Sequence, residues 1–272
     1  MICLALLFFY IKNADILTVL NNRNVIEIIV TVITVSMVHI LKAARLYFAM
    51  FGNNIKLSQY IKNYCKVTPV AIVFPWKTGE LFRMYCYGML SKDYIKGIIF
   101  VLFDRFIDTL ALVSVIILVI FFNGGSITAF ELILFLFILI ILLLYFAYPG
   151  ISKYWKRFFL KADATSQSIK VLETLNICDN IFSEIQRVCK GKGIILFLVS
   201  IFAWFIEIGG LLLYNNNYSI INDDVVNYLL AAMGADKSYE MQRFTIVSVI
   251  LMIIVYLIIK LMELISNKRV GQ

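Results

Sequence analysis

Three charged residues, Asp104, Arg105 and Asp108, stand inside an apolar run from Ile98 to Phe122 that is long enough to span a bilayer. A charge at the centre of a membrane helix costs roughly 2.5 to 3.5 kcal/mol, so charges remain there mainly where they are paired, hydrated or functional. Because Arg105 lies three residues before Asp108, a helix could close an internal pair between them. One net negative charge then remains and requires a cation from elsewhere. The alternative is a structural ion network that fixes helix packing.

A second group of charged residues precedes this run, in the stretch Pro-Trp-Lys-Thr-Gly-Glu-Leu-Phe-Arg from Pro75 to Arg83. Pro75 and Gly79 bracket a predicted turn, and Glu80 and Arg83 lie three residues apart on the helix that follows. Free backbone N–H groups at the turn, with Lys77 and Arg83, could hold a phosphate. Either cation could also neutralise the acids of the following helix. The alternative is that both cations extend to the membrane interface and Glu80 pairs with Arg83.

Glu207 is a further acid within an apolar run, residues 194–214. Acids at this depth often serve proton or ion coupling, but burial in the neutral form explains such a residue equally well. His39 is the only histidine, so it cannot form a metal site with a second one. The sequence predicts no metal and no cofactor.

The elements that must position these residues are membrane helices. Hydrophobic residues make up 62% of the 272 residues, charged residues make up 15%, and the mean hydropathy is +0.90. The apolar runs are continuous rather than alternating, which predicts an all-α polytopic bundle in a single domain, residues 1–272. The net charge of +8 arises from basic residues in short loops beside these runs, which favours a membrane over a nucleic-acid partner.

Five runs have the length of a span, and the apolar start of the chain predicts a short additional one, giving about six spans. The five runs are Val25–Met50, Ile98–Phe122, Ile127–Tyr148, Ile194–Tyr214 and Phe244–Ile265. Two shorter segments, about Thr68–Leu90 and Val225–Met233, are predicted to be re-entrant hairpins or interfacial segments.

Basic residues crowd the connection 152–193, which predicts that this connection and the C-terminus are cytoplasmic. Five spans place the basic residues and the C-terminus on the cytoplasmic side only if each short segment returns to the side of the membrane from which it entered. Within the connection, Thr165–Arg187 has the spacing of an amphipathic helix that lies on the membrane surface.

The sequence resembles a known family in these motifs: Pro-x-x-x-Gly-Glu-x-x-Arg, then Asp-Arg-x-x-Asp about twenty residues later, and a basic stretch, Leu41–Tyr47, at the end of a span. The pattern is similar to that of the lysylphosphatidylglycerol synthase transmembrane family, also called the flippase-like domain family. The matching positions are Pro75, Gly79, Glu80, Arg83, Arg105 and Asp108. The resemblance implies a bacterial or archaeal inner-membrane domain, which in some members translocates an aminoacylated phospholipid made by a fused soluble synthase domain. No such synthase domain is expected within these residues.

The leading hypothesis is a protein that binds or moves a phosphate-bearing lipid, a phospholipid or a polyprenyl-linked precursor, between leaflets. Lys77 and Arg83 would contact the phosphate, the acidic motif at 104–108 would hold Arg83 in place, and Glu207 would meet a cationic headgroup or carry a proton. Two alternatives stay open. One is a membrane-embedded transferase acting on lipid-linked sugars, although no nucleotide loop, nucleophile or metal cluster accompanies the acids. The other is a non-catalytic partner of an envelope glycosyltransferase.

Overall fold

The computed structural model describes residues 25–52, 55–74, 78–123, 129–161, 166–215, 223–233 and 239–270. Within these residues every regular element is a helix. The helices are α3 (Val25–Ala49), α4 (Leu57–Val73), α5 (Thr78–Ser91), α6 (Tyr94–Asn123), α7 (Ala129–Lys161), α8 (Ser166–Cys189), α9 (Gly193–Asn215), α10 (Asp223–Met233) and α11 (Tyr239–Val270).

Five of the described helices, α3, α6, α7, α9 and α11, are long and apolar enough to cross a membrane. Each overlaps one of the five runs predicted from the sequence, and the all-α polytopic class is confirmed. The additional short span expected at the N-terminus lies outside the described residues. The chain is therefore a multi-pass helical membrane protein.

The first predicted hairpin is a pair of helices, α4 and α5, that pack against each other. Its first arm begins at Leu57, well before the expected Thr68, because the polar residues between them continue a helix whose tyrosines are buried. The second predicted hairpin contributes one described helix, α10, whose 11 residues are too few to cross a bilayer. Re-entry of either segment into the membrane stays a prediction.

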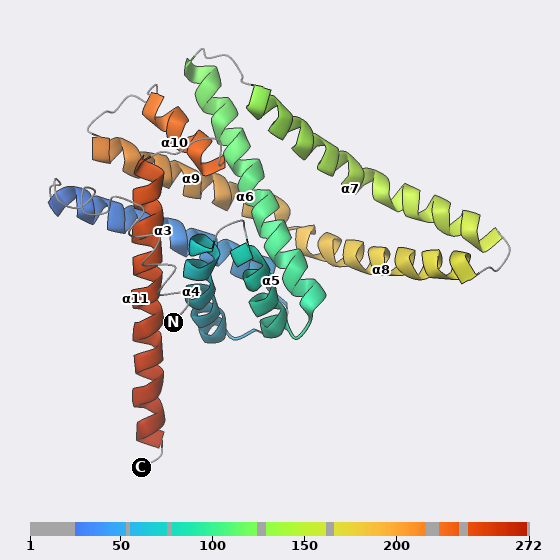
Figure 1. Ribbon diagram of the computed structural model, residues 1–272, viewed down its shortest axis with the longest axis horizontal. Coiled ribbons are helices and arrows are strands. Elements are labelled where there is room, and N and C mark those ends of the chain that lie inside the picture. The colour runs from blue at the N-terminus through green and yellow to red at the C-terminus, as the bar shows by residue number, and fades with distance from the viewer. Residues whose placement is uncertain are drawn as a thin grey trace.

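The helices form a packed bundle with a two-helix arm (Figure 1). In the bundle, α3 lies beside α9, α6 packs against both α5 and α9, and α4 lies between α5 and α11. The arm is made of α7 and α8, which extend together away from the other helices. This arrangement places α3, α5, α6 and α9 around one region, and the charged residues of the sequence motifs lie there.

Two glycines allow α5 and α6 to touch at the backbone. A Cβ atom on Gly97 would lie 2.2 Å from the backbone nitrogen of Gly88, too close for any side chain. Gly79 is similarly confined, since a Cβ there would lie 2.5 Å from the Cα of Ala71 in α4. Gly79 was expected in the turn, but it lies in the first turn of α5, where its small size lets α5 start directly against α4.

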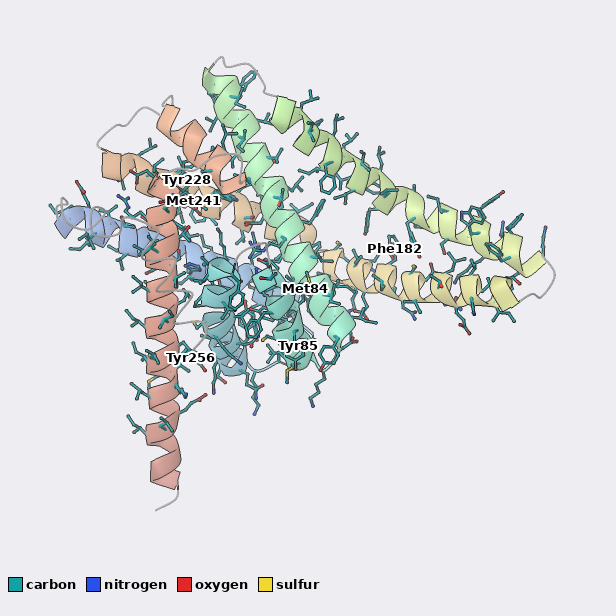
Figure 2. All side chains as sticks on the ribbon, in the orientation of Figure 1. Met84, Tyr85, Phe182, Tyr228, Met241 and Tyr256 are labelled. Carbon is teal, nitrogen blue, oxygen red and sulfur yellow. The ribbon has the colours of Figure 1, made fainter. Side chains whose placement is uncertain are left out.

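Two apolar clusters fill the bundle. The first contains the buried tyrosines Tyr60, Tyr64 and Tyr87 where α4, α5 and α6 meet. The second joins α6, α9 and α10 and contains Tyr228, with Met241 of α11 packed against it (Figure 2). Most other large apolar side chains are exposed, as expected for helices whose outer surface faces lipid.

The helix expected at 165–187 is present as α8, whereas its location on the membrane surface stays a prediction. The preceding helix, however, does not end near Tyr148 but continues to Lys161. At about 1.5 Å per residue the 33 residues of α7 extend about 50 Å, beyond the roughly 30 Å of a hydrocarbon core. The helix is thus longer than one crossing requires, and its polar end, with Ser152 and Lys156, pairs with α8.

The contact between the two arm helices is centred on Asp179 of α8. Its carboxylate accepts hydrogen bonds from Tyr148 (2.9 Å) and Ser152 (2.6 Å) and forms an ion pair with Lys156. These groups lower the pKa of Asp179 to about 2, with the Lys156 ammonium the largest cause. Phe182, labelled on α8 in Figure 2, packs on Tyr148. Their ring centroids are 4.5 Å apart.

Candidate functional site

Six charged side chains from three helices meet inside the bundle. α3 supplies Arg45, α5 supplies Glu80 and Arg83, and α6 supplies Asp104, Arg105 and Asp108. We call these six residues the ion network. Because the three helices are anchored by the apolar clusters and by the close contact at Gly97, the side chains are held where they meet.

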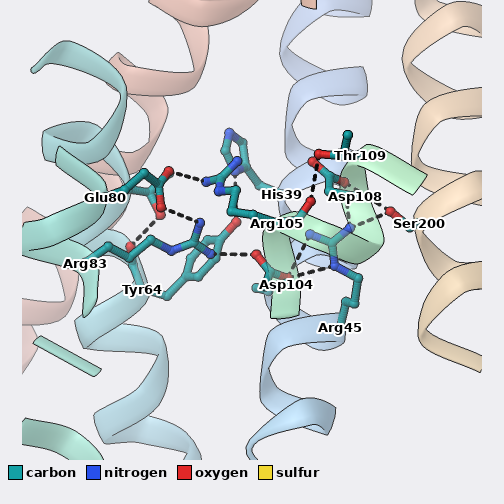
Figure 3. Close-up of polar contacts among 12 residues, drawn as sticks. His39, Arg45, Tyr64, Glu80, Arg83, Asp104, Arg105, Asp108, Thr109 and Ser200 are labelled. Atoms are coloured by element: carbon teal, nitrogen blue, oxygen red, sulfur yellow. Dashed lines mark hydrogen bonds and ion pairs between the residues drawn. The ribbon is translucent and has the colours of Figure 1, made fainter. Parts of the chain in front are cut away.

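The charges of the ion network alternate in sign along one connected path (Figure 3). Arg105 Nη2 lies 2.8 Å from Glu80 Oε1, whose other oxygen lies 3.7 Å from Arg83 Nη1. Arg83 Nη2 lies 3.0 Å from Asp104 Oδ2. Arg45 follows, with Nη2 at 2.7 Å from Asp104 Oδ1 and Nη1 at 2.6 Å from Asp108 Oδ1. Three arginines and three carboxylates give the network zero net charge.

The Asp108 end of the network reaches a fourth helix. Ser200 of α9 donates a hydrogen bond to Asp108 Oδ1 (3.0 Å) and accepts one from Arg45. Ser200 is fully buried, and Arg45 is almost so. The network therefore joins α3, α5, α6 and α9. Its contacts of Asp104 with Arg45 and Arg83 are buried, the setting in which loss of one partner costs most.

Aromatic side chains and His39 line the network. Tyr87 lies with its ring 5.9 Å from the Arg83 guanidinium, in the range of a cation–π contact. Tyr64 lies 3.2 Å, oxygen to nitrogen, from His39 Nδ1. His39 is buried, and this hydrogen bond holds its ring in the packed interior.

Glu207 lies at a second polar site, outside the ion network. Its Oε1 accepts a hydrogen bond of 2.6 Å from the Tyr228 hydroxyl, and its Oε2 lies 3.5 Å from Lys42 Nζ. A small pocket that is open to solvent adjoins it. The pocket is lined by residues of α3, α9, α10 and α11, including Thr31, Thr34, Glu207, Tyr228, Glu240 and Arg243.

The comparison with known proteins agrees with this architecture. The family model of the lysylphosphatidylglycerol synthase TM region matches residues 1–215. The chain belongs to this family. The matched segment ends with α9, so it contains the whole ion network and Glu207, whereas α10 and α11 lie beyond it. No curated protein and no solved structure matches the chain.

In this lysylphosphatidylglycerol synthase TM region, the structure brings five of the predicted residues together: Glu80, Arg83, Asp104, Arg105 and Asp108. The predicted pair between Arg83 and the acidic motif is present as the contact between Arg83 and Asp104. The internal pair expected between Arg105 and Asp108 is replaced, since Arg105 binds Glu80 and Asp108 binds Arg45. Pro75 and Lys77 lie outside the described residues.

Arg45 is the network residue that the sequence interpretation did not assign to the site. It stands in the basic stretch Leu41–Tyr47 at the end of α3, which the sequence interpretation noted only as a motif similar to the family's. Arg45 and Asp104 are 59 residues apart, and no spacing rule pairs residues so distant. The available signal was the negative charge left over on α6, which required a cation from another helix of this TM region.

Proposed function

We propose that this chain binds a phosphate-bearing lipid and moves it between the leaflets of a cell membrane, with its C-terminus on the cytoplasmic side. One observation carries the proposal: an ion network inside an apolar helical bundle that ends, at Arg105, in an accessible cation. Membership of a family named for a phospholipid synthase supports the lipid class. The concentration of basic residues in 152–193 supports the orientation.

The physical reason is the cost of taking a headgroup through hydrocarbon. A lone charge at the centre of a membrane helix costs roughly 2.5 to 3.5 kcal/mol, and a phosphate without a counter-charge meets the same penalty. A fixed cation lowers that barrier because it gives the phosphate a counter-charge. Arg105, at the exposed end of the ion network, provides this cation.

The roles differ along the network. Arg45 and Arg83 lie between acids, with side chains only 4% and 7% exposed, so we assign them to holding α3, α5 and α6 together. The Arg105 side chain is 46% exposed, and we assign it to the phosphate. Glu207 and its pocket stay a candidate for the cationic part of a headgroup or for a proton.

The proposal is tested by reconstitution in vesicles that contain a phospholipid with a fluorescent acyl chain. Dithionite added outside bleaches only outer-leaflet label, so movement between leaflets appears as bleaching beyond half of the signal. A second series with a fluorescent polyprenyl phosphate separates the two lipid classes. We expect movement with the wild-type protein, a strong loss with Arg105→Gln, and wild-type rates with Lys62→Gln, whose ion pair with Glu263 lies on the surface.

A wild-type protein that moves neither lipid faster than empty vesicles would refute the function. Equal rates in wild type and Arg105→Gln would refute the assigned residue. Gel filtration and a tryptophan emission spectrum of each variant establish that the compared proteins are folded.

A further inference from the structure

Of the three arginines in the ion network, Arg105 differs from the other two in both exposure and pairing. Arg83 contacts Glu80 and Asp104, and Arg45 contacts Asp104 and Asp108. Among the described residues, Arg105 has a single ion-pair partner, Glu80, at 2.8 Å from its Nη2. A guanidinium carries five N–H donors in a planar fork, so the half-exposed Arg105 retains donors for a second anion.

Glu80 is placed so that it can leave Arg105 without losing an ionic partner. Its Oε1 binds Arg105, and its Oε2 lies 3.7 Å from Arg83 Nη1, longer than a hydrogen bond, so this second contact can still shorten. Glu80 Oε2 is buried and has no hydrogen bond in the described structure. A small shift of the carboxylate toward Arg83 would give it the hydrogen bonds it lacks.

We propose that Glu80 occupies on Arg105 the place of a phosphate group, and that a lipid phosphate binds by displacing the Glu80 carboxylate onto Arg83. This inference rests on the proposed function, because it identifies how the same site takes its lipid. A carboxylate and a phosphodiester each present two anionic oxygens that accept N–H bonds from a guanidinium. The exchange therefore replaces one charge-assisted contact on Arg105 by another.

The charge balance makes the bound state easy to reverse. The six residues sum to zero, so an added phosphodiester leaves one excess negative charge in the site. Glu80 carries the negative charge nearest to the phosphate, and it competes for the same guanidinium. A site that moves its ligand must also release it, and the competing carboxylate favours release.

The decisive variant is Glu80→Gln, which removes the competing charge while it keeps the size of the side chain. We expect this variant to bind a short-chain phosphatidylglycerol in detergent about tenfold more tightly than wild type, because a charge-assisted competitor is lost. Its lipid movement in vesicles should be slower, since release is retarded. Arg105→Gln should lose binding, Arg105→Lys should retain part of it, and Lys62→Gln should match wild type.

Soluble probes distinguish the sources of the phosphate. Thermophoresis measures the binding of glycerol 3-phosphate and inorganic phosphate to the same variants, and it is also the assay for the short-chain phosphatidylglycerol. Selective tightening for the phospholipid supports the lipid headgroup, whereas equal tightening for inorganic phosphate would overturn the lipid assignment and leave a phosphate site. Binding by Glu80→Gln no tighter than wild type would overturn the exchange itself. If wild type still moves lipid in that case, the proposed function stands and only this inference fails.

Discussion

Replacement of Arg45 by methionine should destabilise the protein more than any surface substitution of the same kind. Arg45 donates from Nε to Asp104 at 2.8 Å and from Nη1 to Asp108 at 2.6 Å, and it also contacts Ser200. The side chain is 4% exposed, so neither water nor lipid headgroups can take its place. Without Arg45, Asp104 retains Arg83, whereas Asp108 is left with the hydrogen bond from Ser200.

The expected loss follows from the burial of these partners. Removal of one member of a buried, hydrogen-bonded ion pair costs about 3 to 5 kcal/mol, because an uncompensated charge stays buried. Lys62→Met provides the matched control, since it removes the ion pair with Glu263, in which both side chains are more than a third exposed. Such a pair contributes about 0 to 1 kcal/mol. The two substitutions should therefore differ by several kcal/mol in the free energy of unfolding.

The assay is titration of the detergent-solubilised protein with SDS, followed by the fluorescence of the tryptophans, of which Trp204 is buried in α9. The variant Arg45→Met with Asp108→Asn should recover roughly half of the loss, because the network returns to zero net charge. An unfolding midpoint for Arg45→Met as close to wild type as that of Lys62→Met would refute the interpretation. A double variant less stable than Arg45→Met would refute the charge-balance argument.

Three further predictions concern the packing of α5 on α6, the polar site at Glu207 and the arm of α7 and α8. Gly97→Ala should destabilise by about 1 to 3 kcal/mol in the same titration, because its Cβ would meet the Gly88 backbone and separate α5 from α6; an unchanged midpoint would contradict this. Tyr228→Phe should cost about 1 to 3 kcal/mol, since it removes the hydroxyl bonded to buried Glu207, and stability equal to wild type would show that the bond is not needed. The pKa of Asp179, lowered to about 2 against about 3.9 in an unfolded chain, means that its contribution to the contact between α7 and α8 is present above pH 4 and lost as pH falls toward 2. Spin labels on α7 and α8 should report that the two helices separate between pH 4 and pH 2 in wild type but not in Asp179→Asn, whose amide does not titrate. The same dependence of the distance on pH in both proteins would refute the role of Asp179.

Much of the fold followed from the length and continuity of apolar runs. In a membrane every backbone polar group must be bonded within the segment, so a long apolar run has one regular solution, the helix. The five predicted spans accordingly appear as α3, α6, α7, α9 and α11. The ends of α4 and α7 were less predictable, because polar residues beyond the apolar part continue a helix when tertiary contacts bury or pair them.

The sequence by itself determined that Asp104, Arg105 and Asp108 lie in a membrane helix and need partners, since charge in an apolar run is costly and local spacing is fixed by helical geometry. The tertiary structure decided which partners they have. Arg45 reaches Asp104 across 59 residues, and Arg105 turns to Glu80 rather than to Asp108. The tertiary structure also decided which arginine side chains are exposed. Arg83 is buried and Arg105 is half-exposed because of how α4, α5 and α6 pack. That packing depends on contacts between residues far apart in sequence.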